Sequence, residues 1–204
     1  MATIAVLTAG CAKNEISIER HDGYTIVSQT RGPELGYSET SGVIILNIDG
    51  FAFKDLDKDG KLDIYEDWRR PVSERAEDLA AQLPIERICG LMLYSSAVDA
   101  MTAELTTKQA GYLKDDYIRH MLVRNIADAA TGAAWSNKVQ AFCEAEPFGI
   151  PSNNSSDPRN YTNGQANTNT YQPEPDGEFD PDGTSKISLW PREVGMAATF
   201  DPMI

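Results

Sequence analysis

One twelve-residue segment constrains this chain more than any other. Residues 55–66 read DLDKDGKLDIYE, with aspartates at alternate positions, glycine in the sixth position and glutamate in the twelfth. This is the spacing of the calcium-binding loop D-x-[DN]-x-[DN]-G-x5-E. The cation takes about 6 to 8 oxygen ligands, and a short segment can surround it only where the chain reverses at the glycine. We therefore predict an EF-hand-like calcium loop at residues 55–66.

Each ligand position of this loop has a residue of the required type. The predicted ligands act through carboxylates, except Lys61, which acts through its backbone carbonyl: Asp55, Asp57, Asp59, Lys61, Asp63 and Glu66. The alternative is an acidic turn that binds no metal. A later acidic stretch, residues 176–183, lacks the closing glutamate because Leu189 stands in its place. Since calcium sensors generally use paired loops, a single loop indicates structural calcium.

Composition excludes several classes of function. The 204 residues include 18 Lys and Arg against 31 Asp and Glu, which gives a net charge of -13 and a pI of about 4.5. Such a chain repels phosphate backbones and anionic membranes, so a nucleic-acid partner is not expected. The sequence has no apolar run of about 18 residues, so a transmembrane span is not expected either. The 41% hydrophobic content is that of an ordinary globular protein.

The first eleven residues are interpreted as an export leader. An apolar run, residues 4–7, precedes Ala9, Gly10 and Cys11. This order resembles a bacterial lipoprotein signal, whose cysteine carries lipid after cleavage. Two features depart from that signal, because the basic start is missing and Thr8 replaces an aliphatic residue. We expect lipidation at Cys11 and export to the periplasm, the outer membrane or the medium; the alternative is a leader with one free cysteine.

The two other cysteines lie in apolar stretches. Cys89 is found in RICGLML and Cys143 in VQAFCEAE. Free cysteine behaves as a small hydrophobic residue, so buried and unpaired thiols are expected at both positions. A disulfide between them is the alternative in an oxidising compartment.

The hydrophobic pattern divides the chain into segments. Residues 12–50 alternate short apolar runs with Gly, Pro and Ser turns, which is typical of a small β-rich segment without catalytic residues. This segment precedes the loop segment, residues 51–70. From Pro71 the period becomes helical, and a second apolar stretch follows Pro84. The helical positions of the first of these are Val72, Ala76, Leu79, Ala80 and Leu83.

A third helix is expected around Trp135, Val139 and Phe142. It is followed by Gly-Ile-Pro and an extended run, an order that indicates an α/β unit. Residues 152–186 are rich in Asn, Asp, Ser, Gly, Pro and Thr and show no hydrophobic period. A stretch of this length without structure is usually functional or disordered.

Several motifs occur in an order that resembles a known enzyme family. They are FKDLDKDGKLDIYEDWRRPVSERAEDLAAQLPIERICGLML, LTTKQAGYLKDDYIRHML, AAWSNKVQAF, FGIPSNNSSDPRN and LWPREVGMAATFDP. Over roughly residues 50–204 the chain resembles the N-terminal part of glycoside hydrolase family 3, the β-glucosidase-like enzymes. The resemblance implies an α/β fold in which residues 71–204 begin a (β/α)8 TIM-type barrel. It also implies hydrolysis of β-linked glycosides with retention of configuration.

The resemblance carries one site residue onto this chain. The family has an Asp after the Gly-Ile-Pro strand that binds hydroxyls of the terminal sugar, and Asp157 matches it. Arg159 is a weaker candidate for the same role, and Asn160 stands where the family commonly has His. Asn153 and Asn154 are expected either to line the pocket or to cap the strand, and His120 to be a surface or packing residue. A turn-forming role for Asp157 before Pro158 is the alternative.

No catalytic pair is recognised in this sequence. Retaining hydrolysis needs two carboxylates about 5 to 5.5 Å apart. The family's nucleophile lies in a Ser-Asp-Trp-like motif that is not found here, and residues 71–204 are fewer than the about 250 of a complete barrel. The leading hypothesis is therefore the N-terminal portion of an exported β-glycosidase that is inactive without the remainder of its barrel. The competing hypothesis is a non-enzymatic, calcium-dependent surface or carbohydrate-binding module similar to a dockerin.

Overall fold

The computed structural model describes residues 13–156 and 198–200 and has a mixed α/β fold. The chain divides into two compact units, Met1–Leu79 and Ala80–Ile204. Cys11, Asp157 and Arg159 lie outside the described residues, so the predictions made for them are not addressed by the fold.

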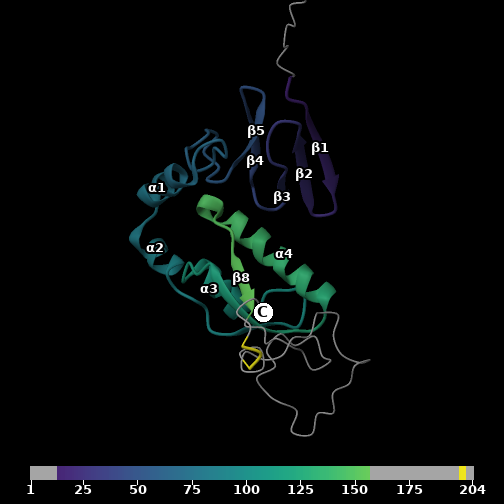
Figure 1. The fold of residues 1–204 in the computed structure, drawn as a ribbon, viewed down its shortest axis with the longest axis vertical. Helices are drawn as coiled ribbons and strands as arrows, with labels where there is room; N and C mark the ends of the chain where they lie inside the picture. Colours follow the sequence, from purple (N-terminus) through teal and green to yellow (C-terminus); the bar gives the residue numbers. More distant parts are fainter. Residues whose placement is uncertain (1–12, 157–197, 201–204) are drawn as a thin grey trace, which may run out of the picture. The chain divides into compact units, whose positions relative to one another are not determined.

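The first unit is built from antiparallel strands (Figure 1). One sheet has the order β1-β2-β3, and β4 pairs with β5 in a separate hairpin. The strands are β1 Ile16–His21, β2 Tyr24–Gln29, β3 Leu35–Ser38, β4 Ile44–Ile48 and β5 Phe51–Asp55. Asp49 and Gly50 both have positive φ, 55° and 80°, as a two-residue hairpin turn requires. The β-rich character expected for residues 12–50 is therefore observed, and β5 extends it to Asp55.

An aromatic cluster joins the exit of the acidic loop to the β4–β5 hairpin. The Trp68 ring stacks on Phe53, with centroids 5.3 Å apart, and Trp68 Nε1 donates to the Ala52 carbonyl at 2.9 Å. Arg69 lies over the Phe53 ring at 4.7 Å and pairs with Asp67 at 2.8 Å. Because Phe53 is fully buried, this packing fixes the segment after the loop against the strand that enters it.

Two helices follow the loop. Helix α1 spans Val72–Gln82 and begins directly after Pro71, whose carbonyl accepts a hydrogen bond from Arg75 N at 3.1 Å. Helix α2 spans Ile85–Leu91. The predicted helices are found at these positions. No residue of α1 is buried among the described residues, and Val72 is 77% exposed. The helical period of α1 is thus correct, and of its apolar side chains only Leu79 is partly buried.

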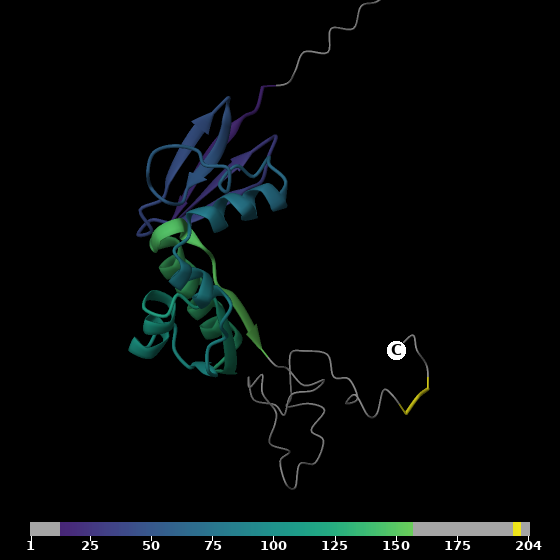
Figure 2. The ribbon, with the colours of Figure 1, turned by 90° about the vertical axis from the view of Figure 1, so that its left-hand side faces the viewer.

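The second unit contains a parallel sheet of order β6-β7-β8. Helix α3 connects β6 to β7, and helix α4 connects β7 to β8. The elements are β6 Val98–Ala100, α3 Thr107–Lys114, β7 His120–Ile126, α4 Ala129–Ala145, the 3-10 turn η1 Pro147–Gly149 and β8 Asn153–Ser156. In Figures 1 and 2, α4 and β8 lie side by side. The predicted α/β unit is therefore present, and the sequence reasoning missed β6, α3 and β7.

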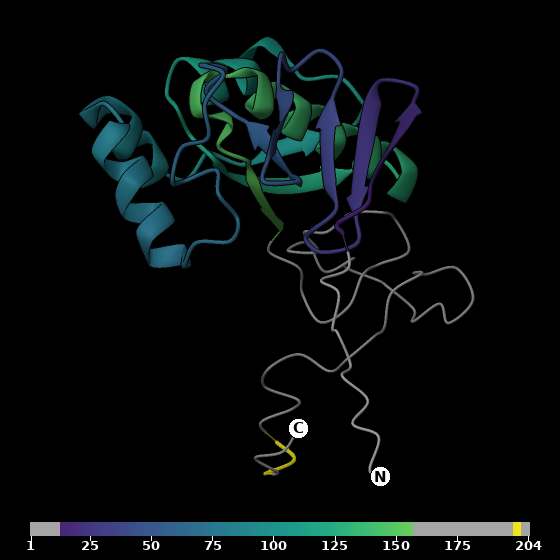
Figure 3. The ribbon, with the colours of Figure 1, turned by 90° about the horizontal axis from the view of Figure 1, so that it is seen from above.

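The core of the second unit lies on one face of this sheet. Trp135, Val139 and Cys143 of α4 are buried against Met121 and Val123 of β7. In Figure 3, α4 is the long green helix that runs alongside the teal strands of this unit. The predicted positions Trp135 and Val139 belong to this core, whereas Phe142 is only partly buried and Cys143 takes the next inward position.

Two expectations are corrected by the fold. Where a first barrel strand was expected, three parallel strands are observed, and residues 13–156 form no closed barrel. Cys89 is exposed, so its predicted burial is wrong; both Cys89 and Cys143 are free thiols. The reason is that α2 turns its neighbour Gly90 inward, where a Cβ would lie 2.4 Å from the Asp116 carbonyl oxygen. Cys143 is buried, and burial raises the pKa of its thiol to about 11.

Replacing Trp135 by alanine is expected to lower the free energy of unfolding by about 3–5 kcal/mol, because it empties the centre of the α4 core. Trp135 is 2% exposed, so the cavity would form between α4 and the sheet. The matched control is Phe200→Ala, since Phe200 is 92% exposed and its loss should change stability by less than about 0.5 kcal/mol. Urea unfolding followed by circular dichroism measures both, and equal effects would contradict the assigned core.

Candidate functional site

The acidic loop connects a buried strand to the segment that precedes helix α1. Asp55 is the last residue of β5 and is fully buried, and Glu66 closes the loop six residues before Val72. Gly60 has a φ of +81°, a conformation that glycine adopts readily, and it provides the reversal expected at this position. The loop is thus entered from a strand, not from the helix of a complete EF-hand.

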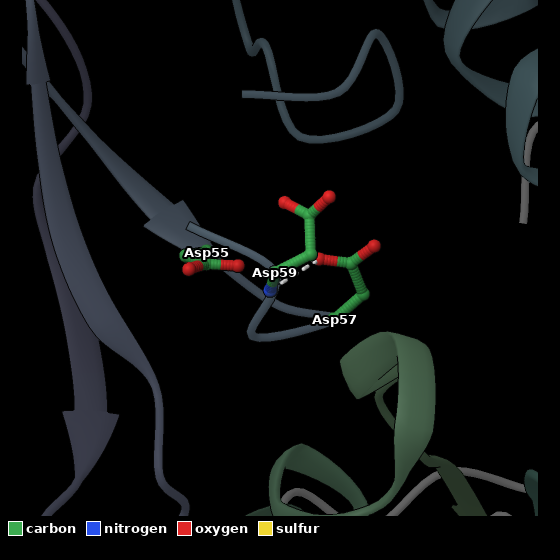
Figure 4. Close-up of side chains that lie close together, drawn as sticks. All are labelled: Asp55, Asp57 and Asp59. Atoms are coloured by element: carbon green, nitrogen blue, oxygen red, sulfur yellow. Dashed lines mark hydrogen bonds between the residues drawn. The ribbon is translucent and has the colours of Figure 1, made fainter. Parts of the chain in front are cut away.

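The three alternating aspartates come together (Figure 4). One carboxylate oxygen from each of Asp55, Asp57 and Asp59 lies within 4.8 Å of the others. Backbone amides of the loop orient these groups. Asp55 accepts from Lys58 N and Gly60 N at 2.8 and 2.9 Å, and Asp57 Oδ1 accepts from Asp59 N at 3.2 Å.

Glu66 ties the two ends of the loop together. Its Oε1 accepts from Leu56 N at 2.6 Å and Asp57 N at 3.3 Å, and its Oε2 accepts from Asp63 N at 3.1 Å. The side chain is buried, so these bonds compensate part of the cost of its desolvation. Glu66 and Asp63 do not join the close group of three aspartates, so the structure brings together only part of the predicted ligand set.

The electrostatics of the loop show concentrated negative charge. Burial raises the pKa of Asp57, and the charges of Asp59 and Asp63 act in the same direction. Burial also raises the pKa of Glu66, with a further contribution from Asp57. The pKa of Asp59 is lowered by its hydrogen bond with Lys61, whose Nζ lies 3.0 Å from Asp59 Oδ2. The negative charges of Asp59 and Asp63 thus repel that of Asp57, and the charge of Asp57 repels that of Glu66, an arrangement that a divalent cation would relieve.

The donor set fits a hard cation. Its side-chain donors are carboxylate oxygens, which calcium and magnesium prefer, and the described residues place no cysteine or histidine among them. The Lys61 side chain is 78% exposed, so it can leave Asp59 when a cation enters. This loop is the candidate metal centre of the chain.

The expected sugar-binding residues, Asp157 and Arg159, lie outside the described residues, whereas the strand that precedes them, β8, is described. β8 ends at Ser156, directly before Asp157 in the sequence. Directly before β8, Ser152 N donates to Gln140 Oε1 at 3.1 Å, and Gln140 Nε2 donates to the Ser152 carbonyl at 2.7 Å. Further along, Asn154 Nδ2 donates to Ser136 Oγ at 3.2 Å. Helix α4 therefore holds β8 through two side-chain contacts.

A buried arginine holds the other side of this strand. Arg119 Nε donates to the Ile150 carbonyl at 2.9 Å, and its Nη1 donates to Leu113 O at 2.7 Å. The Arg119 carbonyl accepts from Asn153 N at 2.7 Å and from Ser152 Oγ at 3.1 Å. The entry of β8 beside β7 is thus held by hydrogen bonds with both the side chain and the backbone of Arg119.

The structure also assembles polar residues that sequence reasoning did not group. Tyr94, His120, Asn153 and Ser155 contact one another on the sheet of the second unit. His120 was expected to be a surface or packing residue, and Asn153 was expected to line a pocket or cap the strand. No motif links these positions, because a parallel register joins residues that are far apart in sequence.

Comparison with known proteins finds no matching family model. A periplasmic beta-glucosidase/beta-xylosidase from Dickeya chrysanthemi is 33% identical over 170 residues, 80% of this chain and 24% of its own length. A protein from Aspergillus flavus named probable beta-glucosidase C is 25% identical over 72% of this chain and 22% of its own length. A protein of the same name from Aspergillus oryzae is also 25% identical, over 69% of this chain and 21% of its own length.

The chain therefore spans about a quarter of the length of these relatives. The resemblance to the β-glucosidase-like enzymes that the motifs predicted is confirmed. Among the described helices, none is both long and apolar enough to cross a membrane.

Proposed function

We propose that this chain is the N-terminal part of an exported, retaining β-glycosidase of glycoside hydrolase family 3. The observation that carries the proposal is the 33% identity to a periplasmic beta-glucosidase/beta-xylosidase across 80% of the chain. The second unit supports it, because strands and helices alternate and the strands are parallel and consecutive in order. This is how a (β/α)8 barrel begins.

In this proposal Asp157 binds hydroxyls of the terminal sugar, with Arg159 as a second contact. In α/β barrels the substrate is bound at the carboxyl ends of the strands, and Asp157 directly follows β8. A carboxylate there can accept hydrogen bonds from two neighbouring hydroxyls. The nucleophile and the acid/base belong to the remainder of the barrel, which is the partner that residues 71–204 require.

The loop Asp55–Glu66 is proposed to bind calcium in a structural role. The three aspartates that lie close together, the buried Glu66 and the mutual repulsion of these carboxylates support this assignment. Lys61 would contribute its backbone carbonyl, and Asp63 would act directly or through water. Bound calcium would neutralise this charge and hold the entry and exit of the loop together.

Export is part of the same proposal. The relative from Dickeya is named periplasmic, and the leader with Cys11 resembles a lipoprotein signal. Lipid at Cys11 would anchor the enzyme at a membrane surface, so the periplasm, the outer membrane and the medium are the proposed locations. Metabolic labelling with an alkyne fatty acid, compared between the natural chain and Cys11→Ser, tests the anchor.

The proposed activity is tested with 4-nitrophenyl β-glucoside and β-xyloside. The 204-residue chain should show no turnover, because it lacks both catalytic carboxylates. The same chain extended through its downstream coding sequence should release 4-nitrophenol, with retention of configuration seen by proton NMR of the first-formed sugar. Turnover by the 204-residue chain, or none by the extended chain, would refute the proposal.

A further inference from the structure

The partly buried side chains of helix α1 lie on one face of the helix. They are Arg75, Asp78 and Leu79, spaced by three and four positions, and the other residues of α1 are exposed. A helix of eleven residues is marginally stable in water when it has no partner. We therefore expect α1 to depend on the contacts that this face makes.

Two of these side chains hold the backbone of Tyr65. Tyr65 N donates to Asp78 Oδ2 at 3.0 Å, and Arg75 Nε donates to the Tyr65 carbonyl at 2.9 Å. Tyr65 is buried, so its backbone groups need partners within the protein. Helix α1 supplies a partner for both of them.

The Tyr65 carbonyl belongs to the peptide group that joins Tyr65 to Glu66, the closing residue of the acidic loop. The amide of the same group, Glu66 N, donates to the Asp63 carbonyl at 3.2 Å within the loop. Because a peptide group is planar, its carbonyl and its amide turn together. Arg75 of α1 and the loop therefore hold opposite sides of one rigid group.

A second attachment of this segment does not involve the loop. Trp68 and Arg69 pack against Phe53 of β5, and these contacts do not require a cation. The two attachments lead to different expectations. If the aromatic cluster alone positions α1, the helix should be insensitive to calcium, whereas attachment through Tyr65 should make it respond.

The charge of the loop gives the response its direction. Residues 55–66 carry five carboxylates against two lysines, and the charges of Asp59 and Asp63 repel that of Asp57. This repulsion opposes closure of the loop, and a divalent cation would remove it. Since Tyr65 is held between the closed loop and α1, a bound cation should favour the attached helix.

We propose that calcium in the loop is coupled to helix α1 through Tyr65. The closed loop presents the Tyr65 backbone to Asp78 and Arg75, so the cation strengthens the attachment of α1, and the attached helix strengthens calcium binding by the same factor. The coupling rests on the calcium site proposed above and not on the glycosidase activity. Calcium would thereby control how firmly the helix is held through which the chain passes from the first unit to the second.

Hydrogen–deuterium exchange of the 204-residue chain, followed by mass spectrometry in calcium chloride and in EGTA, tests the coupling. The protection of the α1 amides should rise about 5- to 150-fold in calcium, the usual range for coupled sites. Amides of β2 serve as the reference for the first unit as a whole, because this strand lies between β1 and β3.

Asp78→Ala removes the acceptor of Tyr65 N and should uncouple the helix. Calcium should then no longer protect α1, while its effect on β2 remains. Calorimetric titration should show calcium bound about 3- to 10-fold more weakly, as the loss of one hydrogen bond would give. Asp78→Asn keeps an acceptor oxygen at this position and should retain most of the coupling.

The matched control is Glu77→Ala. Glu77 is the exposed neighbour of Asp78 on the same helix, so this variant removes the same charge and keeps the bond to Tyr65 N. Calcium affinity and the protection of α1 should both equal those of the natural chain.

Equal weakening by Glu77→Ala and Asp78→Ala would overturn the coupling, because it would indicate a general charge effect. Heat of calcium binding without a change in α1 protection would also overturn it, and the calcium site would stand. Absence of heat would remove the calcium site and the coupling together. Turnover of aryl glycosides by the extended chain tests the glycosidase proposal independently of both.

Discussion

Replacing Asp157 by alanine in the extended enzyme is expected to lower kcat/KM for 4-nitrophenyl β-glucoside about 100- to 1000-fold. A carboxylate that accepts two hydrogen bonds from the sugar contributes about 1.5–3 kcal/mol per bond, because one partner is charged. Bonds that strengthen as the ring distorts towards the transition state lower kcat as well as raising KM. Steady-state kinetics on purified enzyme measure this change.

Two variants sharpen the Asp157 test. Asp157→Asn keeps the shape and one acceptor, so it should retain more activity than Asp157→Ala. Asp22→Ala removes an exposed acid from the turn between β1 and β2 and should leave kcat/KM unchanged. A change of less than threefold in Asp157→Ala would show that the alternative, a turn-forming aspartate, is correct.

Calcium is expected to stabilise the 204-residue chain by about 2.7 kcal/mol when its concentration is 100 times the dissociation constant. We expect the cation to bind only the folded loop, because only there does one carboxylate oxygen of each of Asp55, Asp57 and Asp59 lie within 4.8 Å of the others. Isothermal titration with calcium should give heat, and thermal unfolding should shift upwards with calcium and return with EGTA. Magnesium should be a weaker competitor, because it demands a smaller octahedral site.

A pair of neighbouring variants distinguishes binding from general charge effects. Asp59→Ala removes one ligand of the close group and should abolish the heat. Lys61→Ala removes the ammonium that lies 3.0 Å from Asp59 Oδ2 but keeps the backbone carbonyl, so calcium should bind equally well or more tightly. Heat that persists in Asp59→Ala, or is lost in Lys61→Ala, would contradict the assigned ligands.

Local patterns predicted a substantial part of this structure. The helices at Val72–Gln82 and Ala129–Ala145 were expected from apolar residues at helical spacing, and the reversal at Gly60 was expected from the loop motif. These features depend on residues within a few positions of one another. Periodicity and motif spacing are sensitive to that range.

The features that were missed depend on contacts between distant residues. Strand β7 carries His120, Arg124 and Asn125 among its apolar residues, so no simple alternation marks it in the sequence. The prediction that Cys89 is buried was wrong, because the next residue, Gly90, packs against residues 116–117 and Cys89 faces outwards. A side-chain pattern on one helix does not reveal which face its neighbours cover.

The acidic loop, its glycine reversal and the family resemblance could all be read from the sequence, because each rests on residue types at short, fixed spacings. The fold was needed to show that β6, β7 and β8 are parallel neighbours and that Gln140 and Ser136 of α4 hydrogen-bond to Ser152 and to Asn154 of β8. It alone brought Tyr94 and Ser155 together across 61 positions of the chain. Parallel strands are joined by a long crossover connection, so the residues that pair lie far apart in the sequence and no local pattern identifies them.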